Sequence, residues 1–161
     1  MATITGFVRA NIKATQAAPT GYSGGDVAEV TIDDAITSGT GANQADLLYT
    51  GATSVTGSGS ADVDLRALTS SAGAALSSLA EIVMIVFQWP SAATGSLTIT
   101  PSGSNGLASL GSSIIVPPGG KAILYCPPAA AYAVDGTHKS LNLANAGTTI
   151  SATITLLGRS A

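Results

Sequence analysis

Charged residues are scarce in this 161-residue sequence: Asp, Glu, Lys and Arg make up 9% of it, against about 25% in a typical globular domain. The net charge is −3, and the basic residues are scattered, at Arg9, Lys13, Arg66, Lys121, Lys139 and Arg159. Nucleic-acid binding depends on clustered Lys and Arg that displace counterions, so we expect no nucleic-acid partner. A surface this neutral suggests either that other chains cover much of it or that it is a Ser- and Thr-rich strand face tolerated in water.

The usual catalytic and metal-binding residues are nearly absent as well. Cys126 is the single cysteine and His138 the single histidine, so no internal disulfide forms and a zinc site lacks ligands. His138 follows Gly136 in a turn beside Lys139, where an exposed loop histidine is expected. No Gly-x-Ser-x-Gly nucleophile elbow occurs. We therefore expect no enzymatic activity and no cofactor or metal.

Long hydrophobic runs are missing too. The longest apolar run covers residues 82–87, far short of the roughly 20 residues that span a bilayer. The first residues lack the basic region and apolar stretch of a signal peptide. The expectation is a soluble protein made in a cytoplasm, with no membrane partner.

What the sequence does contain is a succession of short β-branched runs separated by Gly, Pro, Ser and Asn. Residues 4–13 and 28–33 alternate between apolar and polar, which predicts half-buried strands. Residues 17–25 are rich in Gly and Ala and predict a loop. We expect residues 1–37 to form an N-terminal arm or hairpin, and residues 38–161 to form the main domain.

The most apolar segment, residues 79–89, predicts the central strand of that domain. Its apolar residues do not alternate, so both of its faces should be covered, one by the core and one by a neighbouring element or subunit. Pro117 to Gly120 predicts a type II turn. About eight to ten short strands at this spacing predict an all-β, antiparallel sandwich of jelly-roll type. Residues 69–78 are the one candidate for a short helix, or else a wide turn.

Among the acidic residues, Asp62 and Asp64 are two apart on a predicted strand and so share a face. Together with Asp46 they are compatible with a calcium site, although two solvent-facing carboxylates are the commoner arrangement. Glu81 stands just before the apolar run. A carboxylate near buried surface needs a partner, for which Arg66 or an adjacent subunit is the candidate.

Trp89 precedes Pro90 at the end of the central strand. An exposed tryptophan there would suit carbohydrate binding, but an anchor in the core or at a subunit contact is the favoured interpretation, because tryptophan is enriched at interfaces.

Three stretches resemble a class of tailed-bacteriophage virion proteins, the small Gly-, Ala-, Ser- and Thr-rich jelly-roll proteins that decorate or cement the capsid. They are residues 39–48 (GTGANQADLL), residues 60–68 (SADVDLRAL) leading into the apolar strand, and the VPPGG, YAVDGT and ITLLG segments in that order. The likeness covers residues 38–158. Similar domains also occur in head fibres and tail-tip proteins.

The resemblance implies a homotrimer that sits on the capsid surface of the virion and clamps neighbouring major capsid subunits, with no catalysis. The N-terminal strand is a candidate for addition to a partner's sheet edge. The candidate interface residues are Ile4, Phe7, Val8, Arg66, Glu81 and Trp89. The alternatives are a receptor- or glycan-binding module of a head fibre or tail tip and, least favoured, a depolymerase, which would need two carboxylates converging in a cleft.

Overall fold

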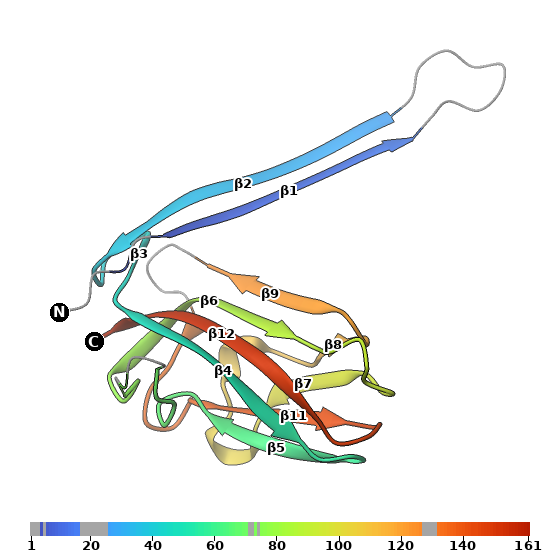
Figure 1. Cartoon of the computed structure of the whole chain (residues 1–161). Helices are drawn as coiled ribbons and strands as arrows, with labels where there is room; N and C mark the ends of the chain where they lie inside the picture. Colours follow the sequence, from blue (N-terminus) through green and yellow to red (C-terminus); the bar gives the residue numbers. More distant parts are fainter. Residues whose placement is uncertain (1–3, 5, 17–25, 71–72, 74, 127–131) are drawn as a thin grey trace, which may run out of the picture.

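The computed structural model describes residues 4, 6–16, 26–70, 73, 75–126 and 132–161, and it folds as two packed β-sheets from which a long hairpin projects (Figure 1). The strands in chain order are β1 (Gly6–Gln16), β2 (Asp26–Ser38), β3 (Gln44–Ala45), β4 (Leu47–Val55), β5 (Gly59–Asp64), β6 (Leu79–Gln88), β7 (Leu97–Pro101), β8 (Ile114–Val116), β9 (Lys121–Tyr125), β10 (Tyr132–Ala133), β11 (Ser140–Asn145) and β12 (Ile150–Ser160). Two short 3-10 turns, η1 (Gly103–Asn105) and η2 (Ala108–Leu110), lie between β7 and β8. Among the described residues, no helix has the length and apolar character to cross a membrane. The predicted all-β class is confirmed.

The strand order is that of a jelly roll. One sheet, called here the arm-side sheet, runs β4–β12–β6, and β6 pairs along its other edge with both β9 and β10. The other, called the distal sheet, runs β5–β11–β7–β8. If the strands from β4 to β12 are renumbered 1 to 8, with the short β10 left out, the order is 1-8-3-6 in the arm-side sheet and 2-7-4-5 in the distal sheet. Every pairing within the two sheets is antiparallel. The predicted antiparallel sandwich is therefore confirmed.

The main core lies between the sheets and follows the alternation of each strand. Leu97, Ile99, Leu141 and Leu143 of the distal sheet are all less than 2% exposed, and they face a matching set from the arm-side sheet: Ile85, Phe87, Ala152, Ile154 and Leu156. Val63 on β5 is also buried, as predicted, while Asp62 is exposed.

The predicted central strand is confirmed as β6, which has partners along both edges. Its pairing with β12 contains a β-bulge, because Met84 pairs with Leu157 while Ile82 pairs with Gly158. Val83 is the extra residue. Its side chain is fully buried, in a small second cluster with Ile36 of β2 and Ala45 of β3.

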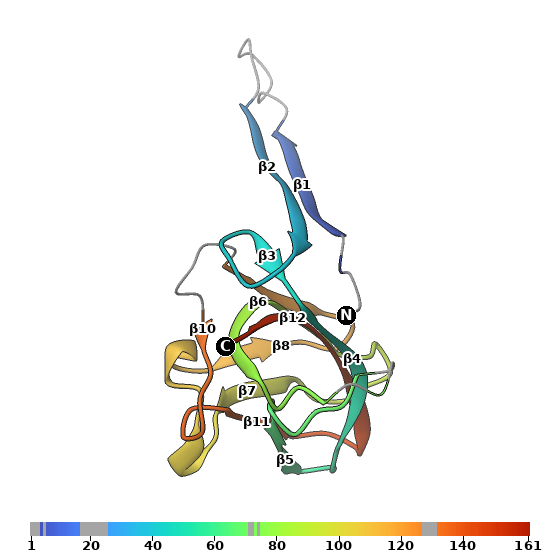
Figure 2. The same cartoon turned by 90° about the vertical axis from the view of Figure 1, so that its left-hand side faces the viewer.

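The hairpin of β1 and β2 is antiparallel along its whole length, from the Gly6–Ile36 pair to the Gln16–Asp26 pair. Figure 2 shows it standing away from the sandwich. β2 continues to Ser38 and pairs there in parallel with β3, which completes a separate three-stranded sheet, and Asp46 links β3 to β4 of the sandwich. The predicted loop at residues 17–25 lies outside the described residues.

Two turn predictions are resolved. The Gly120 amide donates to the Pro117 carbonyl at 2.8 Å and Gly119 has a φ of 76°, as a type II turn requires. Within residues 69–78, an isolated β-bridge joins Thr69 to Ala75 and Leu76 is buried. The described part of that segment is a wide turn.

Candidate functional site

The outer face of the arm-side sheet carries the most unusual surface of the described chain. Its strand register places two rows of side chains across β9, β6, β12 and β4. We call these rows the apolar face; they consist of Tyr125, Met84, Leu157 and Leu48, followed by Ile123, Val86, Thr155 and Thr50. Neither row contains a charged residue.

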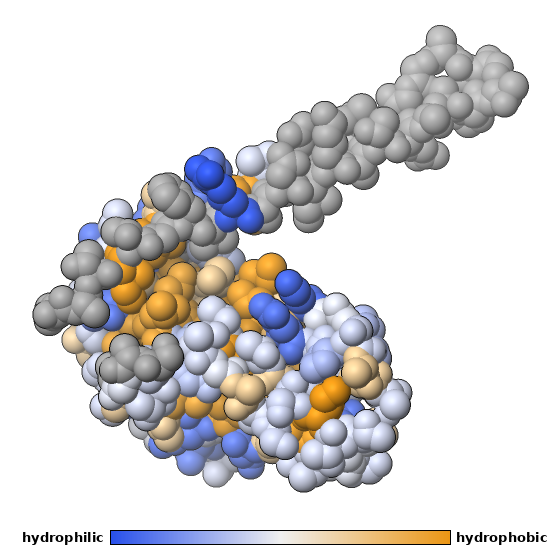
Figure 3. Space-filling view, in the orientation of Figure 1, coloured by the Kyte–Doolittle hydropathy of each residue, from blue (hydrophilic) through white to orange (hydrophobic). Residues whose placement is uncertain are grey.

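Much of the apolar face is open to solvent. Ile123 is 58% exposed and Leu48 is 47% exposed, while Met84, Val86 and Leu157 are half-buried. Figure 3 shows hydrophobic side chains gathered beneath the foot of the hairpin. Contiguous apolar surface of this kind marks interaction sites in soluble proteins.

The foot of the hairpin already covers one end of this face. Ile36 packs with Val83 and Ala45 in one buried cluster. Tyr125 and Leu157 of the apolar face pack against that cluster. The Tyr125 hydroxyl donates to the Asp34 carboxylate at 2.9 Å. Burial, and then the hydrogen bond to Asp34, raise the pKa of Tyr125 to about 12. The arm is therefore fixed to the sheet by both apolar and polar contacts.

Further along the hairpin, Arg9 pairs with Asp33 at 2.8 Å, and both side chains are more than half exposed. Of the candidate interface residues in this region, Ile4 is half-buried just before β1. The register places Phe7 opposite Ala35 and Val8 opposite Asp34, but the side chains of Phe7 and Val8 lie outside what the structure describes. Their role at an interface stays a prediction.

The predicted partner of Glu81 is wrong. Glu81 forms an ion pair with Arg159, its cross-strand neighbour on β12, with Oε2 and Nε 3.0 Å apart. Arg159 is fully buried and also donates from Nη1 to the Gly41 carbonyl at 2.8 Å. Arg66 instead donates from Nε to the Ser77 carbonyl at 2.7 Å. Glu81 is thus satisfied within its own chain and needs no adjacent subunit.

Trp89 is a core anchor. It is 2% exposed, and its indole N–H donates to the Gly95 carbonyl at 2.7 Å. The interpretation as an exposed carbohydrate platform is wrong, because the ring has no free face. Of the two anchor roles favoured for Trp89, the one in the core is confirmed. The buried ring leaves no side-chain surface for the other, a subunit contact.

The carboxylates proposed for calcium do not converge. Asp62 accepts hydrogen bonds from Asn142 at 2.8 Å and Ser102 at 2.7 Å, which lower its pKa. Asp64 pairs with Lys139 at 2.6 Å. Asp46 lies by the arm-side sheet, where it accepts from the Ser160 amide.

Among the described residues, no group of three or more His, Cys, Asp and Glu side chains is placed to hold a metal. Burial acts to raise the pKa of Asp64, but its bonds to Lys139 and to the Arg66 amide outweigh burial and lower it.

Next to Asp62, the outer face of the distal sheet is hollowed by a shallow depression of about 540 Å³. Small and polar residues line it, among them Ser60, Thr98 and Asn142. No aromatic ring and no carboxylate lines it. It therefore offers hydrogen bonds but no stacking surface.

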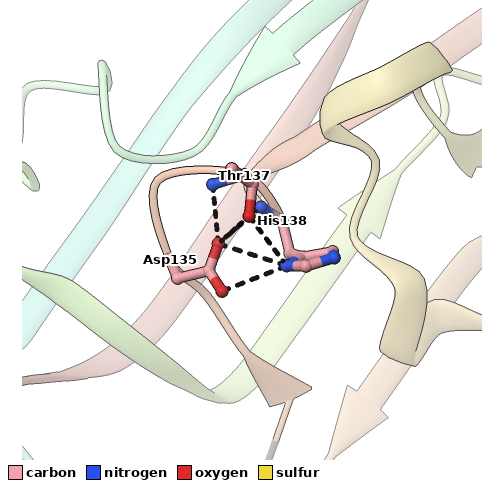
Figure 4. Close-up of polar contacts among 3 residues, drawn as sticks. All are labelled: Asp135, Thr137 and His138. Carbon is pink, nitrogen blue, oxygen red and sulfur yellow. Dashed lines mark hydrogen bonds and ion pairs between the residues drawn. The ribbon is translucent and has the colours of Figure 1, made fainter.

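The single histidine is exposed, as predicted, but its partner was missed. Asp135 accepts hydrogen bonds from the backbone amides of Thr137 at 2.6 Å and His138 at 2.7 Å, and its Oδ2 lies 3.0 Å from His138 Nδ1 (Figure 4). The bond to His138, with those from Thr137, holds the pKa of Asp135 well below its usual range. The Asp-Gly-Thr-His spacing was the available signal. The group closes a surface turn, in which the Thr137 hydroxyl donates to Asp135 Oδ1 at 2.9 Å and lies 3.2 Å from His138 Nδ1.

In comparisons with known proteins, no family model, no curated protein and no solved structure matches the chain.

Proposed function

We propose that this protein is a non-enzymatic structural protein of a tailed-bacteriophage virion, which decorates the capsid surface and stabilises it by binding across major capsid subunits. The observation that carries the proposal is a jelly-roll sandwich that bears a projecting hairpin and an exposed apolar face, two features suited to protein contact. The sequence resemblance supports the virion as their setting. A fold by itself does not determine function, since jelly rolls occur in both capsid and lectin domains.

The chemistry of the described side chains favours binding over catalysis. Asp62 and Asp64 are held by hydrogen bonds or an ion pair on a solvent-facing sheet. Asp135 and His138 bind each other in an exposed turn. Glycoside cleavage would need two carboxylates converging on a substrate, and this arrangement does not provide them. A neutral surface with little charge also suits close packing against other proteins on a lattice, where many weak contacts add up.

The alternative is a receptor- or glycan-binding module. One observation favours it, the depression on the distal sheet with its Ser, Thr and Asn lining. The burial of Trp89 removes the aromatic platform on which this alternative relied. Capsid decoration is therefore the better-supported proposal.

The test is co-sedimentation of the purified protein with expanded capsids of the source phage that were prepared without it. We expect saturation at a fixed ratio to the major capsid protein, and a higher temperature of capsid disruption at saturation. Unassembled capsid subunits, used as the control, should not bind. Failure to bind capsids, combined with binding to host cells or polysaccharide, would replace the proposal by the receptor-binding alternative.

A further inference from the structure

The hairpin has two unlike faces. Residues of a strand alternate between faces, and the register puts Ile36 and Ile32 on the same face. Ile36 is buried against the sheet and Ile32 is half-buried. The exposed Arg9–Asp33 ion pair marks the opposite face.

Toward the tip, the register continues this division. Ile32 pairs with Ala10, and the next positions on that face pair Val30 with Ile12 and Ala28 with Ala14. We call these positions, together with Ile36, the aliphatic face of the arm. On the other face the register sets Lys13 opposite Glu29. A two-stranded hairpin is marginally stable by itself in water, and burial of an apolar face against another surface would stabilise it.

The contact at the foot shows what kind of surface that is. Ile36, at the base of the aliphatic face, packs on Val83, which belongs to the outer side of the arm-side sheet. Beyond this point the hairpin projects away from its own sandwich (Figure 1). The apolar face of that sandwich remains open, with Ile123 more than half exposed (Figure 3). Each chain thus combines a projecting arm, whose register positions toward the tip are aliphatic, with an open apolar sheet face, and Ile36 joins the two at the foot.

We propose that the aliphatic face of the arm of one copy packs on the apolar face of the arm-side sheet of a second copy. Continuity with the contact at the foot favours a second copy over an unrelated partner, because the same sheet already accepts the base of the same arm. The rows of the apolar face and the register pairs from Ile32–Ala10 to Ala28–Ala14 contain no charged residue. Asp34, on the same face of the arm nearer the foot, already accepts a hydrogen bond from Tyr125 of its own chain, so the contact requires no unpaired charge to be buried.

A contact between an arm and a sheet joins unlike surfaces, so it repeats head to tail, and it closes into a ring where the rotation from one copy to the next permits. The inference deepens the proposed function, on which it rests only for the premise that these surfaces bind protein. It names the partner as another copy of the chain, and it leaves the capsid to contact other parts of the ring.

The test is the solution mass of single-residue variants, measured by size exclusion with light scattering over a range of protein concentrations. Wild type should have a mass that is two or more times the 15.7 kDa of one chain. Ile123→Glu on the sheet and Ile32→Glu on the arm should each place a carboxylate in the contact. Both should weaken association by about 100-fold or more, since a buried unpaired charge is costly, and shift the mass toward the monomer.

Two matched controls separate this effect from added charge alone. Ile115 on β8 is 65% exposed on the outer face of the distal sheet, so Ile115→Glu makes the same change at similar exposure. Thr31 is the exposed neighbour of Ile32 on the opposite face of the arm. Ile115→Glu and Thr31→Glu should keep the wild-type mass. Thermal melting establishes that each variant is folded.

The inference would be overturned by a wild type that stays monomeric at tens of micromolar, or by Ile123→Glu and Ile32→Glu variants that keep the wild-type mass. If Ile123→Glu assembles normally but no longer sediments with capsids, the apolar face binds the capsid. That result would end this inference and leave the proposed function standing. If wild type assembles as expected but does not bind capsids, the inference stands and the proposed function falls.

Discussion

The outer faces of the two sheets are built from the same alternating strands and yet differ in chemistry. On the distal sheet, the row across β5, β11 and β7 reads Asp62, Asn142 and Thr100, and Asp62 accepts a hydrogen bond from Asn142. On the arm-side sheet, the corresponding central residues are Met84 and Val86, in rows without a charge. The distal face has partners for its polar groups within the chain, whereas the arm-side face has apolar area that only another surface can cover.

The burial patterns of single strands show the same difference. Antiparallel sheets commonly pack one face on the core and leave the other in water, which gives a hydrophobic-in, polar-out alternation. β5 and β11 follow that rule. β6 departs from it, and the departure locates the surface at which binding is expected.

The largest contrast between the faces should come from Val83→Asp. Val83 is fully buried beneath the foot of the arm, so an aspartate there places an unpaired charge in an apolar cluster, at a cost of about 4 kcal/mol or more. Loss of cooperative unfolding by circular dichroism is the expected result. Ile115→Asp, on the exposed distal face, should change the unfolding free energy by less than about 0.5 kcal/mol. A soluble Val83→Asp protein with the wild-type melting curve would contradict the placement of the arm on the sheet.

The ion pairs of the two sheets offer a second contrast. Glu81→Ala removes the carboxylate that faces the fully buried Arg159 and should cost about 3 kcal/mol. Asp64→Ala removes the partner of Lys139, whose side chain is 26% exposed, and should cost about 1 kcal/mol. Urea denaturation of both variants measures the difference. Equal losses would mean that burial does not distinguish the two pairs.

The smallest effect should appear in the pH dependence of stability. Because the folded-state pKa of Tyr125 is raised from 10.0 to about 12, the folded state keeps this proton when the unfolded state releases it. The stability that Tyr125 contributes is therefore present below pH 10 and lost as the pH rises toward 12.

Tyr125→Phe should flatten this alkaline decline and cost about 1 kcal/mol at neutral pH through the lost hydrogen bond to Asp34. Asp62 on the distal sheet should show the opposite pH dependence. Because its pKa is lowered in the folded state, the stability that it contributes is present above its ordinary pKa and lost as the pH falls below it. Thermal melting from pH 2 to 12 records both the acid and the alkaline decline in stability. An alkaline decline of the same size in Tyr125→Phe and in wild type would contradict the assignment.

Much of the fold could be predicted because local patterns determine it. The alternation at Val63 and the unbroken apolar run of β6 gave the sheet positions correctly, and Pro117 with Gly119 gave the turn. These signals depend on backbone preferences and on burial within one segment.

The contacts that were missed depend on register between distant segments. Arg159 lies opposite Glu81 only because β12 pairs with β6 through a bulge at Val83, and nothing local to Glu81 indicates that pairing. Arg66, the nearer candidate in sequence, donates instead to the Ser77 carbonyl. The apolar face is likewise a product of four strands, so no single segment reveals it.

The position of β12 has a consequence for how the chain is made. β12 is the last strand in chain order, yet it lies between β4 and β6 in the middle of the arm-side sheet. During synthesis on a ribosome, β4 and β6 therefore emerge before the strand that pairs with both of them. Until β12 is made, their unpaired backbone N–H and C=O groups can pair with a neighbouring nascent chain. Closing the gap joins residues about a hundred positions apart, such as Thr50 and Thr155, so formation of the sheet should be slow. Synthesis at high local concentration is then the stage at which this protein is most exposed to aggregation.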